Sequence, residues 1–99
     1  MGGTFNVITR DDILEAQEAG YDGYFQKVSR CLDEAFKAAA QEHGADEIHH
    51  NIFYIPILWC QRLCDDITEK YEANGFTVAY TIRNSNDISH QHVLFHIGM

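Results

Sequence analysis

The spacing of apolar positions changes along the chain, and each pattern predicts a different kind of element. Apolar side chains recur at three- and four-residue steps from Asp22 to His43 and from Ile57 to Asn74, which predicts two amphipathic helices. A shorter helix is expected before them, beginning at the capping residue Thr9 and ending near Gly20, because glycine weakens a helix interior.

Alternation of apolar and polar residues predicts strands in the last quarter of the chain. Phe76–Ile82 and Gln91–Met99 alternate on either side of the turn-forming Arg83–Ser89, which predicts a hairpin. The β-branched and aromatic stretch His49–Ile55, which Pro56 ends, predicts a further strand. The expected order is α-α-β-α-β-β, an α+β fold in which residues 1–99 form a single domain.

A three-stranded sheet with the helices packed on one face would bury these apolar stripes. The covered face should carry the apolar members of the hairpin: Phe76, Val78, Tyr80, Val93, Phe95 and Ile97. The opposite face should be open to solvent or to a partner, and it should carry Thr77, Ala79, Thr81, His92, Leu94 and His96.

The net charge of −8 lies in the first three quarters of the chain. Phosphate contact relies on Lys and Arg, so we expect no direct binding of nucleic acid. The carboxylates follow the predicted helices: Asp11, Asp12, Glu15, Glu18, Asp22, Asp33, Glu34 and Glu42, then Asp65, Asp66, Glu69 and Glu72. Such a surface is either the solvated side of amphipathic helices or a patch that binds the basic nucleic-acid-binding groove of another protein.

Composition also bears on the compartment. No apolar stretch approaches the roughly 20 residues that span a bilayer, and the first residues lack the basic start of a signal peptide. Cys31, Cys60 and Cys64 are an odd number on predicted apolar helix faces, so we expect buried, unreactive thiols. We therefore expect a cytoplasmic protein without a membrane partner. Trp59 is expected in the core or at its edge.

The histidines are the candidates for metal chemistry. His90, His92 and His96 alternate along the last predicted strand, and His49 and His50 open a strand that can lie beside it. His92 and His96 are about 13 Å apart along a strand, too far for one tetrahedral site, and no carboxylate is close in sequence. We expect no metal, and histidines that contact a partner or water; a metal site is the alternative.

Motifs of catalysis are missing from the sequence. It contains no phosphate-binding loop, no nucleophile motif and no metal-hydrolase motif. We therefore expect no catalytic residues, no cofactor and no enzymatic activity.

Three stretches give the chain an outline that resembles short, uncharacterised phage-encoded α/β proteins of mostly unassigned role: Ile8–Ala16, Tyr71–Tyr80 and Val93–Met99. They correspond to a brief capped helix, a helix that ends in Gly-Phe-x-Val, and a closing strand. The chain departs from this pattern at Met99, where such proteins tend to end in Trp. The resemblance implies a phage or mobile-element setting, where many small acidic proteins bind and disable host machinery.

These observations predict a non-catalytic, acidic module that binds and inhibits a host defence protein in the bacterial cytoplasm. The residues expected to contact the partner lie on the acidic helices and on the open sheet face: Asp11, Asp12, Glu15, Glu18, Asp65, Asp66, Glu69, His92, Leu94 and His96. Two alternatives remain open. One is an assembly component that forms a homo-oligomer, and the other is a histidine-based metal-binding protein.

Overall fold

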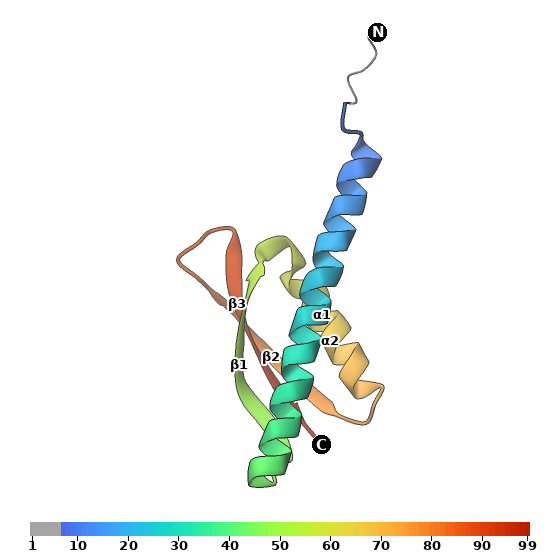
Figure 1. The fold of residues 1–99 in the computed structure, drawn as a ribbon. Coiled ribbons are helices and arrows are strands. Elements are labelled where there is room, and N and C mark those ends of the chain that lie inside the picture. Colours follow the sequence, from blue (N-terminus) through green and yellow to red (C-terminus); the bar gives the residue numbers. More distant parts are fainter. Residues whose placement is uncertain (1–6) are drawn as a thin grey trace.

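Two helices and three strands make up the fold in the computed structural model, which describes residues 7–99 apart from the side chains of His50 and Asn51. The elements are α1 (Arg10–His43), β1 (Glu47–Pro56), α2 (Ile57–Glu72), β2 (Thr77–Asn84) and β3 (His90–Gly98). Both helices lie on one side of the sheet (Figure 1). The α+β class expected from the sequence is confirmed.

The long helix α1 is continuous over 34 residues, so the prediction of two helices that meet near Gly20 is wrong. A Cβ atom at position 20 would meet Cη2 of Trp59 at 2.9 Å, so Gly20 is where the α2 indole lies against α1. The Trp59 ring also packs edge-on against Tyr21 and Tyr24. Tertiary packing therefore outweighs the low helix propensity of the glycine.

The two ends of α1 are those that the sequence predicted. The Thr9 hydroxyl accepts a hydrogen bond from the Asp12 amide at 3.1 Å, and the Asp12 carboxylate accepts one from the Thr9 amide at 3.0 Å. This capping box satisfies amides that have no partner within the helix. Gly44 ends the helix in the left-handed conformation, with φ of 65°, which glycine adopts without steric cost.

The sheet has the strand order β1-β3-β2, and both neighbouring pairs are antiparallel. Val93, Phe95 and Ile97 of the central strand point to the helices and are fully buried. They pack with Leu32 of α1 and with Leu63, among other α2 residues, in one core cluster. The hairpin was predicted, whereas the insertion of β3 between β1 and β2 was not.

Some boundaries and exposures differ from the prediction. Strand β1 begins at Glu47, two residues before the expected start, and Phe76 lies before β2 instead of within it. Tyr80 is on the helix side of the sheet but is 36 % exposed, because β2 is an edge strand. Its hydroxyl accepts a hydrogen bond from the Gln61 amide instead of being buried in the core.

The helices differ in length, and this difference leaves part of α1 uncovered. With a rise of about 1.5 Å per residue, α1 is about 50 Å long and α2 only about 24 Å. The first turns of α1 extend beyond the sheet and α2 (Figure 1). Every residue from 7 to 19 is exposed. We call residues 10–17 the helix arm.

Candidate functional site

The helix arm continues the apolar stripe that holds α1 on the body of the protein. Tyr21 and Val28 are 2 % and 1 % exposed, and Leu14 lies seven residues before Tyr21, on the same face of the helix. Leu14 is 42 % exposed and its neighbour Ile13 is 48 % exposed. The stripe therefore runs past the end of the surface that covers it.

Carboxylates border this exposed part of the stripe. Asp11 and Glu18 lie three residues before and four residues after Leu14, positions that share its face of the helix, and Glu15 is adjacent to it. Of these acids, Asp11 and Glu15 have no hydrogen bond or ion pair among the described residues. The arm thus combines an apolar strip with negative charge, which suits a basic surface with an apolar centre.

The base of the arm is attached to α2 through Arg62. Its guanidinium donates two hydrogen bonds to the Glu18 carboxylate, at 2.7 and 3.0 Å, in the bidentate arrangement that suits arginine. The guanidinium also lies 3.8 Å from the centre of the Tyr21 ring. The Arg62 hydrogen bonds lower the pKa of Glu18 below its ordinary value. Glu18 therefore has a structural role in addition to its place beside the arm.

The predicted acidic residues of α2 lie apart from the arm and are partly engaged within the protein. Asp66 accepts a hydrogen bond from the Tyr21 hydroxyl, and burial together with this bond raises the pKa of Tyr21. Asp65 accepts one from the Gln61 side chain at 2.9 Å. Glu69 is exposed. Arg62 lies between the carboxylates of the two helices, since it also lies 3.8 Å from Asp66, so among the described residues a basic side chain interrupts the predicted acidic surface.

The face of the sheet opposite the helices is the second predicted surface. As expected, His92 and His96 are exposed there, and Leu94 lies between them, half-buried. Ile52 and Tyr54 of β1 share this face and are 65 % and 46 % exposed. The centre of the open face is therefore apolar, with histidines toward both of its ends.

Two imidazoles and a carboxylate meet at one end of the open face, which the sequence analysis did not anticipate. Nε2 of His96 lies 3.4 Å from Oε2 of Glu47, and Nδ1 of His49 lies 4.0 Å from Oε1 of Glu47. The two imidazole rings are perpendicular, with their centres 5.1 Å apart. We call Glu47, His49 and His96 the His-Glu cluster. Its residues come from the start of β1 and the end of β3.

A register shift explains how β1 brings these residues to the open face. Between Ile48 and Asn51 the β1 strand advances by three residues while β3 advances by two, from Ile97 to Phe95, so β1 contains a bulge. Side chains alternate between faces along a strand, and the extra residue reverses that alternation. Glu47, which precedes the bulge, therefore shares a face with Ile52 and Tyr54 beyond it, and the contacts of His49 with Glu47 and His96 place its side chain on the same face.

The other end of the open face holds His90, which contributes to the turn between β2 and β3. Its ring stacks on Tyr54 with the ring centres 4.5 Å apart. The Tyr54 hydroxyl donates to Asp87 at 2.9 Å, and both the hydroxyl and the amide of Ser89 donate to the same carboxylate. These hydrogen bonds, with Ser89 first, lower the pKa of Asp87 to about 2.

This Ser-His-Asp grouping does not have the geometry of a nucleophilic triad. The Ser89 hydroxyl lies 2.7 Å from Nδ1 of His90, and Asp87 lies 3.4 Å from the same nitrogen. A triad needs the nucleophile and the acid on opposite nitrogens of the imidazole. The contacts are those of a rigid turn. His92, which lies beside the Tyr54 ring, takes no part in them and is also outside the His-Glu cluster.

The cysteines divide into two groups. Cys60 and Cys64 are buried as predicted, and burial raises the pKa of Cys64 to about 12 and that of Cys60 above its ordinary value. Thiols in this state are poor nucleophiles and poor metal ligands. Cys31 is exposed, so the prediction that it is buried is wrong. It lies on α1 beside Leu32, one position away from the buried stripe.

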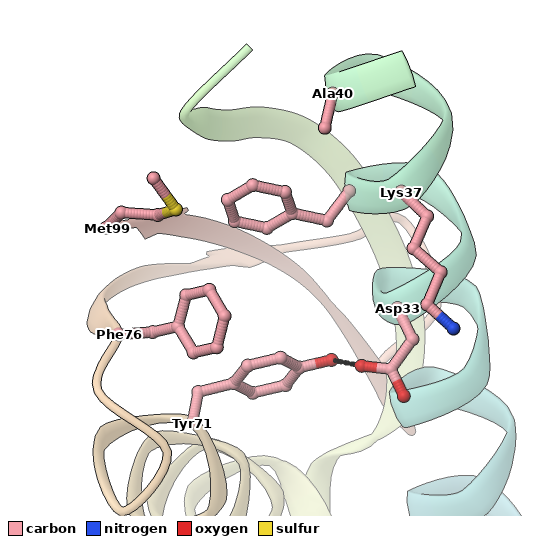
Figure 2. Close-up of a pocket in the computed structure, with 7 residues that line it drawn as sticks. Asp33, Lys37, Ala40, Tyr71, Phe76 and Met99 are labelled. Carbon is pink, nitrogen blue, oxygen red and sulfur yellow. Dashed lines mark hydrogen bonds between the residues drawn. The ribbon is translucent and has the colours of Figure 1, made fainter. Parts of the chain in front are cut away.

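A hollow of about 300 Å³ lies between α1, the end of α2, the start of β2 and the last residue of the chain. Figure 2 shows the rings of Tyr71 and Phe76 lining it, with Met99 at its edge. The Tyr71 hydroxyl donates a hydrogen bond to Asp33. Burial and this bond raise the pKa of Tyr71, which keeps the phenol protonated. The hollow is therefore mainly apolar, and the Asp33 carboxylate at its edge is engaged by the Tyr71 hydroxyl.

Two residues of these sites were absent from the sequence-based candidates. Glu47 was missed because the strand was predicted to start at His49. Once the strand is extended to Glu47, the two-residue spacing places Glu47 and His49 on one face. Arg62 is one of two basic residues among the carboxylates of α2, and the local sequence gives no signal of its partner in α1. His50, which was considered as a metal ligand, has a side chain outside the described residues.

Comparison with known proteins gives no relative from which a function could be transferred: no protein-family model, no curated protein and no solved structure matches the chain. Within residues 7–99, neither helix is long and apolar enough to cross a membrane. The function must therefore be argued from the residues of the chain itself.

Proposed function

We propose that the protein is a non-catalytic binding module whose helix arm docks on another protein. The observation that carries the proposal is the uncovered apolar stripe: Leu14, in line with the buried Tyr21, is 42 % exposed and is bordered by carboxylates. The packed body of the protein buries Tyr21. A partner groove that received the arm would bury Leu14 in the same way. Amphipathic helices bind partner grooves through anchors spaced in this way.

The energetics of the arm also favour a partner. The arm is the first two turns of a continuous 34-residue helix, so the unfavourable nucleation of a helix is already provided by the packed part of α1. The arm is held at one end by the capping box and at the other by the Arg62 contact. Because both ends are already ordered, a partner would spend little binding free energy on folding the segment.

Charge indicates which kind of partner would fit. Residues 10–18 contain four carboxylates and one arginine. A surface rich in Lys and Arg with an apolar slot would attract this segment over a distance and then bury Leu14. Such a surface is typical of the nucleic-acid-binding groove of another protein. The resemblance to short phage-encoded proteins suggests that the partner is a host defence protein, which the module would inhibit by covering that groove.

Site-specific crosslinking in cells of the source host tests this proposal. A photo-crosslinking amino acid at position 14 should give a single crosslinked product with a different protein. The matched control places it at position 41, which is exposed in the last turns of the same helix. Glu15→Lys should weaken the position-14 crosslink. No position-specific product, or equal products from both positions, would contradict the proposal.

A second candidate function is assembly into a homo-oligomer through the open face of the sheet. The exposed apolar residues Ile52, Tyr54 and Leu94 favour it, because contiguous apolar patches are uncommon on the surface of monomers. The arms of two copies would repel each other, so the interface would lie on the sheet. The mass measured by sedimentation over a range of concentrations separates the two candidates: a dimer that persists on dilution and is lost in Ile52→Lys favours assembly.

A further inference from the structure

We infer that the His-Glu cluster is a binding site for a divalent transition metal ion of the Zn²⁺ type. The inference does not depend on the proposed function, since the cluster lies on the open face of the sheet, just beyond the last turn of α1, whereas the helix arm is at the first turns of that helix. It rests on the convergence of Glu47, His49 and His96, whose ligand atoms all lie within 4.8 Å of one another.

The donor set suits this class of metal. Two imidazole nitrogens and one carboxylate oxygen are the ligands of three-residue zinc sites, which leave a fourth position for water or another ligand. Imidazole favours Zn²⁺, Cu²⁺ and Ni²⁺, whereas Mg²⁺ and Ca²⁺ prefer sites made of oxygen ligands only. The cluster should therefore discriminate against the alkaline-earth ions.

The distances are close to those of a formed site. With bonds of about 2.0–2.1 Å in a tetrahedron, two ligand atoms are about 3.3 Å apart. Nε2 of His96 lies 3.4 Å from Oε2 of Glu47, and Nδ1 of His49 lies 4.0 Å from the other oxygen, Oε1; with one ligand atom from each residue, all three atoms lie within 4.8 Å of one another. The three side chains are 43 % to 53 % exposed, so they can rotate to shorten the remaining distances without disturbing the core.

The backbone around the cluster is that of a prearranged site. Glu47 is paired with Gly98 in the sheet, His49 lies in the bulge that follows Ile48, and His96 comes from the neighbouring central strand, so the backbone of two adjacent strands brings the three residues together. The β1 bulge includes His49 and lies between Glu47 and the apolar centre of the face. Bulges recur beside functional sites, where they redirect side chains. On the far side of His96 the β2 residue is Ala79, whose small side chain leaves the cluster open.

A bound ion would also connect an edge strand to the centre of the sheet. Glu47 and His49 belong to the edge strand β1, just after the turn from α1, and His96 belongs to the central strand β3. Since the ion would bind the folded protein and not the separated strands, it should raise the midpoint of thermal unfolding. This gives a readout that is independent of any partner.

The test is titration of the metal-free protein with Zn²⁺, in a Cys31→Ser background that removes the exposed thiol. We expect one ion per chain, tetrahedral visible absorption when Co²⁺ replaces Zn²⁺, and a rise in the unfolding temperature. Three substitutions should each weaken Zn²⁺ binding at least tenfold: Glu47→Gln, His49→Ala and His96→Ala. Loss of a residue that only supports a metal ligand already weakens binding about tenfold or more. The three substitutions should also abolish the thermal shift.

The matched control is His92→Ala, which removes an exposed imidazole from the same strand and the same face. Its distance from His96 is about 13 Å along the strand, so it should leave the affinity and stoichiometry unchanged. Circular dichroism checks that each variant folds. Two results would overturn the inference: no stoichiometric binding by the folded protein, or an equal loss of binding in His92→Ala and in His96→Ala, which would indicate scattered imidazole binding.

Discussion

The arm of α1 and the remainder of the same helix carry one apolar stripe in two different surroundings. From Tyr21 onward the stripe is covered by α2 and the sheet, and Val28 and Leu32 are almost fully buried. Before Tyr21 the stripe continues through Leu14, but nothing in the described chain covers it. The packed part of α1 therefore holds the fold together, whereas the arm is expected to contribute little to stability and leaves its apolar side chains exposed.

Alanine substitutions at matched leucines give the largest expected contrast between the two parts. Leu32→Ala should lower the free energy of unfolding by about 2–5 kcal/mol, because it leaves a cavity in the core. Leu14→Ala should lower it by less than about 0.5 kcal/mol, since the side chain is already exposed to water. Urea unfolding measures both. Equal losses would show that the arm is packed in the free protein.

Loss of the helix cap should affect the arm alone. Thr9→Ala removes the hydroxyl that accepts the Asp12 amide, and a lost cap costs about 0.5–2 kcal/mol of local helix stability. Amide hydrogen exchange should become faster throughout the arm and stay unchanged after residue 24. Thr9→Ser keeps the hydroxyl and should behave like the unmodified protein. Faster exchange along the whole of α1 would argue against an independent arm.

The two glycines at the junction should respond differently to alanine substitution. Gly23→Ala should raise the stability by about 0.5–1 kcal/mol, because no atom lies within 4 Å of the added Cβ and alanine favours the helix. Gly20→Ala should give no gain, since its Cβ would meet the Trp59 ring. Thermal unfolding of both variants tests whether Gly20 is a packing contact; a similar gain in both would show that the indole does not constrain position 20.

The smallest expected effect comes from the contact at the base of the arm. Arg62→Gln should lower the unfolding temperature slightly, because ion pairs between exposed side chains contribute little. The pKa of Glu18 is lowered in the folded protein, so the contact stabilises the fold above about pH 4.5 and is lost as the pH falls below it. The difference from the unmodified protein should therefore become smaller in acid, where only the contact of the guanidinium with the Tyr21 ring remains. Arg30→Gln, a similar loss of charge on α1, serves as the control.

Local patterns predicted most of the elements. The alternation in the hairpin, the apolar face of α2 and the caps of α1 depend on residues close in sequence, and the structure has each of them. The break at Gly20 was wrong because the stabilising contact comes from Trp59, in another helix. Helix propensity describes the isolated segment and does not include such contacts.

The site residues were harder to predict for the same reason. Glu47 and His96 are 49 residues apart, and their contact depends on β3 lying beside β1 and on the bulge that turns Glu47 to the open face. Neither feature has a clear signature in one sequence. The exposure of His92 and His96 followed from alternation alone and was predicted. The exposure of Leu14 was not predicted, because it follows from the full length of α1 and the sequence was interpreted as two separate helices.

Affinity for the crosslinked partner tests the central claim, that the arm is a docking element, most directly. Isothermal titration should show that Leu14→Asp binds the partner at least about tenfold more weakly than the unmodified protein, as expected for an anchor buried in an interface. Glu42→Lys, a charge reversal at the far end of the same helix, should bind with unchanged affinity. If Leu14→Asp also binds with unchanged affinity, the arm is not the docking element.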